Sequence, residues 1–214
     1  MSAFEAAAQH GYGVELDVFL SRDEVPVISH DASLARIAGV DARIGQLTVA
    51  ELARLRLDGT ADGVPTLAAA LAVLDSVPVM VEIKPQRVRA GRVEERTARV
   101  LEAHPGPWCV ASFNPASVRW FRRNLPDAVR VLTASLSVEV RIPGMVVRRL
   151  AALRDLPSVA PHAVSYDVGG LPTDTTDAWR AGGGVLVAWT AVGEAGLTRA
   201  RQLADNVIFE HVLP

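Results

Sequence analysis

Residues 14–20 read Val-Glu-Leu-Asp-Val-Phe-Leu, and residues 77–84 read Val-Pro-Val-Met-Val-Glu-Ile-Lys. Both runs are dense in apolar and β-branched residues, which is typical of strands buried on both faces of a parallel sheet. Glu15 and Asp17 stand two residues apart, so a strand places both side chains on one face. The acidic and basic residues at the end of the second run have the same spacing. Together the two stretches predict charged side chains that converge on one rim of a sheet.

The rest of the chain alternates short β-rich runs with longer helical ones. Repeated strand–helix units imply right-handed crossovers and an α/β architecture. A doubly wound sheet would carry a glycine-rich first turn, which this sequence lacks, so a TIM-type (β/α) barrel is favoured. Five more strands are expected, at Trp108–Ser112, Ala128–Thr133, Ala163–Asp167, Val185–Thr190 and Asn206–Glu210. Helices are expected after Thr48, Thr66 and Asn114, which can cap them, and at 92–103, 145–154, 174–181 and 194–204.

The segment Val25–His30 follows the first strand after only four residues. That gap is too short for a parallel crossover, so we expect a small β-hairpin extension that carries His30 back toward the rim. With seven core strands, an eight-stranded barrel would lack strand one and helix eight, which are neighbours in the closed ring. We expect residues 1–214 to form a single domain.

Composition limits the possible partners. The chain has 214 residues, half of them apolar, and a net charge of −2, which gives no overall electrostatic reason to expect nucleic acid or an anionic membrane as a partner. Cys109 is the single cysteine and stands in a strand-like setting, so a disulfide within the chain and a cysteine-type zinc site are excluded. No run is long enough to cross a membrane and no signal peptide is evident, so a cytoplasmic location is expected.

The charged residues at the strand ends indicate chemistry. Carboxylates such as Glu15, Asp17 and Glu82 are hard oxygen ligands suited to Mg²⁺ or Ca²⁺. Two carboxylates pointing into a barrel repel each other unless a cation lies between them. Lys84 can neutralise charge on a phosphate, and His30 can transfer protons, because an ordinary imidazole titrates near neutral pH. These residues predict metal-assisted phosphodiester chemistry.

The chain resembles the glycerophosphodiester phosphodiesterase family over essentially its full length. The stretches that carry the resemblance are Gly11-Tyr12-Gly13-Val14-Glu15-Leu16-Asp17-Val18, Val25-Pro26-Val27-Ile28-Ser29-His30-Asp31, Leu47-Thr48 with Glu51-Leu52, Val64-Pro65-Thr66-Leu67, Val81-Glu82-Ile83-Lys84-Pro85, Ala111-Ser112-Phe113 and Ala188-Trp189-Thr190. The resemblance implies that Glu15, Asp17 and Glu82 bind a divalent cation, that Lys84 contacts the phosphate, and that His30 is catalytic. Family members open with a His-Arg-Gly strand that supplies a second catalytic histidine, and this sequence begins after it. We therefore expect weak activity from the sequence as written.

Several alternatives stay open at this point. The activity could instead be that of another phospholipid-head-group phosphodiesterase on the same barrel, or the chain could be a catalytically silent relative that binds metal or phosphoglycerol. Trp189 either packs in the core or forms an apolar wall for the carbon face of a polyol. His211 or Glu210 could occupy the space left by the absent strand. Edge strands with unpaired backbone groups make a homodimer a further expectation.

Overall fold

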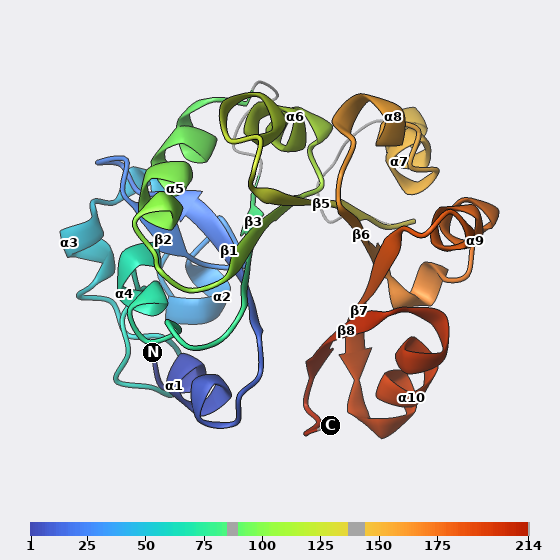
Figure 1. Cartoon of the computed structure of the whole chain (residues 1–214). Coiled ribbons are helices and arrows are strands. Elements are labelled where there is room, and N and C mark those ends of the chain that lie inside the picture. Colours follow the sequence, from blue (N-terminus) through green and yellow to red (C-terminus); the bar gives the residue numbers. More distant parts are fainter. Residues whose placement is uncertain (85–89, 137–143, 214) are drawn as a thin grey trace. The chain divides into compact units, whose positions relative to one another are not determined.

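The protein is described by a computed structural model that covers residues 1–84, 90–136 and 144–213, and its chain separates into two compact units, Met1–Val110 and Ala111–Pro214 (Figure 1). The first unit contains α1 (Ser2–Gln9), β1 (Val14–Leu20), β2 (Pro26–Ile28), α2 (Ala35–Ala38), the 3-10 helix η1 (Ile44–Gln46), α3 (Val49–Leu52), α4 (Leu67–Leu71), β3 (Val79–Ile83), α5 (Arg92–Glu102) and most of β4 (Trp108–Ser112). The second contains α6 (Pro115–Asn124), β5 (Val129–Ala134), α7 (Gly144–Ala151), α8 (Leu156–Val159), β6 (Ala163–Asp167), η2 (Val168–Gly170), α9 (Asp174–Ala181), β7 (Val185–Val192), α10 (Gly193–Leu203) and β8 (Asn206–Glu210).

The centre of the first unit is strand β1, which pairs with a strand on each side. It runs parallel to β3, with Val14 opposite Val79 and Asp17 opposite Glu82. On its other edge it pairs antiparallel with β2, with Val18 opposite Ile28. The antiparallel pairing confirms the predicted hairpin. Because β1 and β3 are parallel and in this register, the acidic residues of both strands lie on the same face at neighbouring positions.

The turn of this hairpin is fastened to α5. Glu24 lies in this turn with a positive φ of 63°. Its carboxylate forms ion pairs with Arg92 and, at 2.7 Å, with Arg96. Beneath the hairpin, a hydrophobic cluster contains the fully buried Val27 and Leu52. The hairpin is therefore held by charge at its tip and by apolar packing along its length.

Predicted helix caps in this unit are present. The hydroxyl of Thr48 accepts a bond from the Glu51 backbone N–H, and the Glu51 carboxylate accepts from the Thr48 backbone N–H at 2.7 Å. Thr66 caps α4 in the same way through the backbone N–H of Ala69. Such caps satisfy amide groups that the first helical turn leaves without partners, which fixes where α3 and α4 begin.

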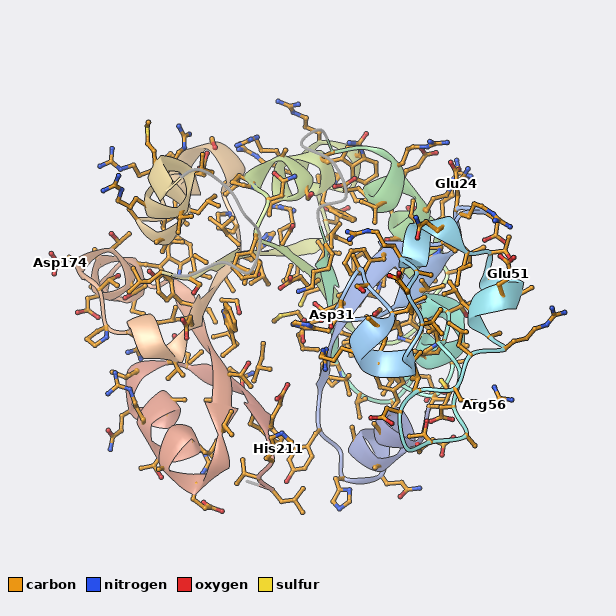
Figure 2. The ribbon with its side chains drawn as sticks, turned by 180° about the vertical axis from the view of Figure 1, so that it is seen from behind. Glu24, Asp31, Glu51, Arg56, Asp174 and His211 are labelled. Carbon is orange, nitrogen blue, oxygen red and sulfur yellow. The ribbon has the colours of Figure 1, made fainter. Side chains whose placement is uncertain are left out.

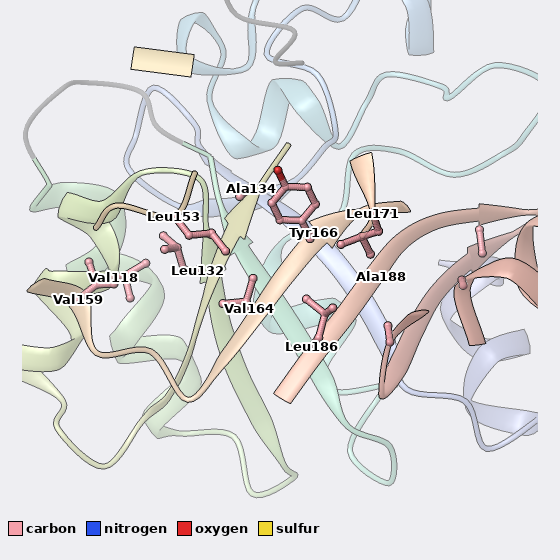
Figure 3. Close-up of a cluster of buried hydrophobic side chains, with 13 residues drawn as sticks. Val118, Leu132, Ala134, Leu153, Val159, Val164, Tyr166, Leu171, Leu186 and Ala188 are labelled. Carbon is pink, nitrogen blue, oxygen red and sulfur yellow. The ribbon is translucent and has the colours of Figure 1, made fainter. Parts of the chain in front are cut away.

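The second unit contains the parallel strands β5, β6, β7 and β8. Ala163 of β6 lies opposite Val131 of β5 and Val185 of β7. Their apolar side chains meet the helices in a cluster that includes Val164 and Leu186 (Figure 3). Tyr166 is wholly buried there, and its hydroxyl donates to the Ala151 carbonyl at 2.9 Å, so the one polar atom of that side chain is satisfied.

Four of the seven predicted core strands have the predicted bounds, at Val14–Leu20, Trp108–Ser112, Ala163–Asp167 and Asn206–Glu210. The strand expected at Val77–Ile83 begins instead at Val79, because the Val77 amide bonds back to Leu74 in a turn and Pro78 has no N–H to donate. The strand expected to end at Thr190 continues to Val192. The helix expected at 145–154 ends at Ala151, since Leu153 has a positive φ of 51° that a helix cannot contain.

Candidate metal and phosphate site

Three carboxylates gather on one face of the β1–β3 pair. Asp17 and Glu82 are opposite each other in the parallel register, and Glu15 lies two residues before Asp17 on the same face. One carboxylate oxygen from each residue can be chosen so that all three lie within 4.8 Å of one another. Asp17 and Glu82 are only 8% and 7% exposed. The sequence prediction that these three residues come together is thus consistent with the geometry.

A single ammonium group lies among these carboxylates. The Nζ atom of Lys84 is 2.8 Å from Asp17 Oδ1 and 2.7 Å from Glu82 Oε1. Its position follows from the strand, since Lys84 comes two residues after Glu82 and its side chain returns to the same face. Three carboxylates and one ammonium leave a formal charge of −2 when all are ionised, which a single divalent cation would neutralise.

Burial sets the protonation behaviour of this group. It raises the pKa of the Glu82 carboxyl above its ordinary value; Lys84 opposes this shift, Asp17 adds to it, and the charge of His30 opposes it. Burial alone would lower the pKa of Lys84, but Glu82 and Asp17 reverse the shift and raise it. The lysine is therefore held in its charged form by the same carboxylates that it neutralises.

The donor set fits a hard divalent cation. Glu82 Oε1 is fully buried, and Lys84 Nζ contacts it at 2.7 Å as an ion pair. One ammonium leaves the buried cluster with an excess of negative charge, which is an expensive arrangement unless another cation balances it. Two oxygens bound to one calcium ion at roughly 2.3–2.6 Å can lie up to about 5 Å apart, so three carboxylate oxygens within 4.8 Å of one another have the spacing that ligands of one ion can have.

His30 lies two residues after the end of β2, and the hairpin brings this segment alongside β1. The Ser29 backbone N–H donates to the Asp17 carbonyl at 3.0 Å, so His30 follows a residue that is hydrogen-bonded to the metal-ligand candidate. The imidazole is half exposed, with 51% of its side chain accessible. A residue in this position is open to a substrate, whereas Asp17 and Glu82 are closed off by their neighbours.

Asp31 orients the His30 ring. His30 Nδ1 lies 2.9 Å from Asp31 Oδ1, and Arg36 Nε donates to the other oxygen, Asp31 Oδ2, at 2.6 Å. The Arg36 bond chiefly, with His30 adding to it, holds the pKa of the Asp31 carboxyl below its usual range. Figure 2 labels Asp31. The sequence shows His30 and Asp31 as neighbours, but it gave no prediction for Arg36, the second residue of α2.

Cys109 lies on β4 beside this group and is not a nucleophile. Burial raises the pKa of its thiol to about 12, and the negative charge of Glu15 contributes. A thiol with that pKa carries almost no thiolate at neutral pH. The sequence interpretation of Cys109 as a strand residue is consistent with this environment.

Trp189, predicted to contact substrate, is on β7 in the second unit. Its ring meets Phe113 edge to face, with 5.6 Å between the ring centroids. The indole Nε1 is buried and has no hydrogen-bond partner among the described residues. His211, labelled in Figure 2, is exposed and follows β8 with a positive φ of 56°. Nothing in the second unit tests the roles predicted for Trp189, His211 or Glu210, and those roles stay predictions.

Fold and site together have the character of a phosphodiester hydrolase. The chain belongs to the glycerophosphoryl diester phosphodiesterase family, whose model matches residues 1–211. A curated relative from Mycobacterium tuberculosis, "Probable glycerophosphodiester phosphodiesterase 2", is 29% identical over 204 residues, which cover 89% of this chain and 72% of the relative. The rat protein "Lysophospholipase D GDPD1" is 29% identical over 126 residues, covering 52% of this chain and 40% of that protein.

Solved structures give the same result for the fold. A phosphodiesterase from Oleispira antarctica, solved in complex with the product sn-glycerol-3-phosphate, matches with a TM-score of 0.82 at 23% identity, covering 97% of this chain and 85% of that one. The glycerophosphodiester phosphodiesterase of Thermotoga maritima matches with a TM-score of 0.73 at 24% identity, covering 97% and 86%. The predicted α/β fold of TIM-barrel type is confirmed, while the predicted absence of strand one and helix eight stays a prediction. Within the described ranges, no helix has both the length and the apolar character that crossing a bilayer requires.

Proposed function

We propose that this chain hydrolyses a glycerophosphodiester to sn-glycerol 3-phosphate and an alcohol, at the carboxylate cluster of β1 and β3. The observation that carries the proposal is the cluster itself: Glu15, Asp17 and Glu82 have carboxylate oxygens within 4.8 Å of one another, and Lys84 forms ion pairs with two of these residues. Membership of the phosphodiesterase family supports the reaction class. The family depends in general on a divalent metal, and the donor set suits Mg²⁺ or Ca²⁺.

In this proposal Glu15, Asp17 and Glu82 hold the cation. When bound, such a cation supplies Lewis-acid stabilisation of charge on phosphoryl oxygens. The three carboxylates bring the charge that attracts it, and Lys84 keeps two of them from repelling each other before it arrives. Lys84 also presents positive charge near the phosphate, where negative charge grows as the phosphorus–oxygen bond breaks.

His30 moves the proton. With Asp31 accepting from Nδ1, the ring offers Nε2 to the substrate, and the half-exposed position leaves that atom reachable. Hydrolysis adds one water across the phosphorus–oxygen bond: the hydroxyl goes to phosphorus and the proton to the departing alcohol. His30 Nε2 serves one of these two transfers, with Asp31 and Arg36 holding the ring in place.

Trp189 is proposed as an apolar contact for the carbon face of the substrate. Its edge-to-face packing on Phe113 fixes the ring plane. An indole face held this way suits a polyol, whose carbons present C–H groups on one side. This role is separate from the carboxylate cluster and is tested separately, by a Trp189→Phe variant whose KM should rise while kcat changes little.

A second candidate is head-group release from a lysophospholipid, favoured by the similarity to the rat and human proteins named lysophospholipase D. Both reactions cleave a phosphodiester beside glycerol and differ in whether an acyl chain is present. The carboxylates, Lys84 and His30 would act on the phosphate in the same way in each case.

The test measures release of sn-glycerol 3-phosphate from glycerophosphocholine, with lysophosphatidylcholine assayed in parallel for choline. The protein is stripped with chelator, and Mg²⁺ or Ca²⁺ is then restored. We expect release only with a restored cation and a loss of about 10²–10⁴-fold in kcat for His30→Ala. Asp31→Asn should lose less than His30→Ala and shift the pH profile. Absence of cation-dependent release from both substrates in the folded protein would leave the silent, phosphoglycerol-binding reading as the correct one.

A further inference from the structure

The net charge of the chain conceals a strong asymmetry. Residues 115–159 contain eight arginines and three acidic residues, a net charge of +5, whereas the remainder has fourteen basic and twenty-one acidic residues, a net charge of −7. The positive segment contributes α6, α7 and α8, all in the second unit, where α8 lies beside α6 (Figure 1). An overall charge of −2 therefore describes no particular surface of this protein.

The arginines of α6 share one side of the helix. Arg119 is followed by Arg122 and Arg123, three and four residues later, and residues at these spacings are neighbours on a helix surface. Arg122 and Arg123 are exposed, and Arg119 is partly so. Val118 and Phe121 are the large apolar side chains of α6 that are buried toward the core. The cationic side thus faces away from the core.

The helix α7 combines cations with exposed apolar side chains. Met145 is 76% exposed and Val146 is 40% exposed. Arg148 and Arg149 stand three and four residues after Met145, so they flank it on the same side of the helix. Only Ala151, on the other side, is buried within α7. At a membrane surface, exposed apolar side chains beside arginines can enter the acyl boundary while the guanidinium groups stay at the level of the head groups.

The two helices direct their arginines to one place. Arg119 Nη1 and Arg149 Nη2 lie 3.5 Å and 3.0 Å from the same oxygen, Asp155 Oδ1. Arg122 Nη1 donates to the Ser158 carbonyl at 3.0 Å. Contacts to the single segment 155–158 show that the cationic sides of α6 and α7 adjoin.

From these observations we propose that α6, α7 and the turn that precedes α8 form a docking face for an anionic lipid surface. The face consists of Arg119, Arg122, Arg123, Arg148, Arg149 and Arg154 with Met145 and Val146. Among the described residues, Asp155 is the one carboxylate that forms ion pairs with these arginines, and it is buried and engaged with Arg119 and Arg149. Arg123, Arg148 and Arg154 form no ion pair with any residue of the described part of the chain, so their charge is free for lipid head groups.

Charge complementarity together with the apolar residues selects a lipid surface over other polyanions. A nucleic acid would use the arginines but gains nothing from an exposed methionine. A bilayer uses both, since arginine stems lie along the apolar side chains while the guanidinium groups reach the phosphates. The inference is independent of the proposed hydrolysis, because none of these residues belongs to the carboxylate cluster.

The experiment measures sedimentation of the whole protein with vesicles of phosphatidylcholine, with and without about 30% phosphatidylglycerol. We expect binding to the anionic vesicles that weakens as salt is raised. Each basic residue near an anionic surface is worth about fivefold in binding. The triple variant R123Q/R148Q/R154Q should therefore lose roughly a hundredfold in partition coefficient. The double variant M145S/V146S should bind more weakly while keeping its salt dependence.

A matched control removes the same charge elsewhere. The variant R54Q/R56Q/R201Q also deletes three exposed arginines and should bind vesicles like the unmodified protein. Turnover of glycerophosphocholine, or the circular dichroism spectrum if there is none, verifies that each variant is folded. The proposal is overturned if the unmodified protein ignores anionic vesicles, if both triple variants lose binding equally, or if M145S/V146S binds unchanged. Displacement by duplex DNA at equal phosphate concentration would reassign the face to nucleic acid.

Discussion

Replacing Glu82 by glutamine should change the response of this protein to divalent cations far more than it changes the metal-free protein. In the metal-free state the variant loses one partner of Lys84, whose Nζ still has Asp17 at 2.8 Å. The variant also loses a buried carboxylate. Burial raises the pKa of this carboxyl, and the negative charge of Asp17 repels it. Breaking a buried ion pair is costly when it leaves one charge without a partner, but in this variant Lys84 keeps Asp17 as its partner. We expect the metal-free stability to change by no more than about 1 kcal/mol.

The metal-bound state gives the larger effect. A cation at one hundred times its dissociation constant stabilises a protein by about 2.7 kcal/mol. Mutation of a residue that only supports a metal ligand typically lowers metal affinity by about 10–100-fold. Loss of one of three charged ligands should therefore lower it by about a hundredfold or more. At the same cation concentration the variant would then gain only about 0.4 kcal/mol. The difference of about 2.3 kcal/mol corresponds to roughly 5–9 °C in Tm for a chain of this length.

Scanning calorimetry of chelator-treated protein, with and without Mg²⁺ or Ca²⁺, measures both quantities in one series. Glu102→Gln is the matched control, because Glu102 is an exposed carboxylate at the end of α5 in the same unit. The control should keep the full cation-dependent rise in Tm. An equal rise in Glu82→Gln and in the unmodified protein would refute the argument that Glu82 holds the cation.

Three further predictions concern other groups. Lys84→Met should lower metal-free stability by about 3 kcal/mol, because two buried carboxylates then face each other, and added cation should recover part of the loss; an unchanged Tm in chelator would contradict this. Asp155→Asn should cost about 1–3 kcal/mol in urea unfolding at neutral pH. The pKa of Asp155 lies below its ordinary 3.8, chiefly because of the hydrogen bond from Arg149. The stabilisation by the ionised Asp155 is therefore present above pH 3.8 and is lost as the pH falls through the lower folded-state pKa. The stabilities of the variant and the unmodified protein should converge in that acidic range. Cys109, with a thiol pKa of about 12, should resist a thiol reagent at pH 8 in the folded protein and react once urea unfolds it.

Local sequence patterns were sufficient for the elements that carry the site. Alternation in Val14–Leu20 placed Glu15 and Asp17 on one face, and the strand has those bounds. Thr48 and Glu51 specified a capping box, which is formed. These features depend on neighbours within a few residues along the chain, and the side chains concerned determine them directly.

Contacts across long separations needed the tertiary structure. The register that sets Asp17 opposite Glu82 joins residues more than sixty positions apart, and the sequence of either strand alone is compatible with other registers. Lys84 was expected to meet a phosphate, which stays a prediction, and the structure shows ion pairs of Lys84 with Asp17 and Glu82 that the sequence did not specify. The pairing of Arg36 with Asp31 depends on how the chain turns between β2 and α2, which residue spacing does not specify.

The family, the alternation of strands and helices, and the charged residues of the candidate site could thus be predicted from the amino-acid sequence. The folded structure was needed to show which of those charges are in contact, how deeply Asp17 and Glu82 are buried, and that the arginines of α6 and α7 meet at Asp155. The difference arises from the distance along the chain over which each kind of interaction acts. Periodicity and capping are fixed by interactions within one or two turns of chain, whereas electrostatic energies and burial depend on distances that exist only after distant segments have packed.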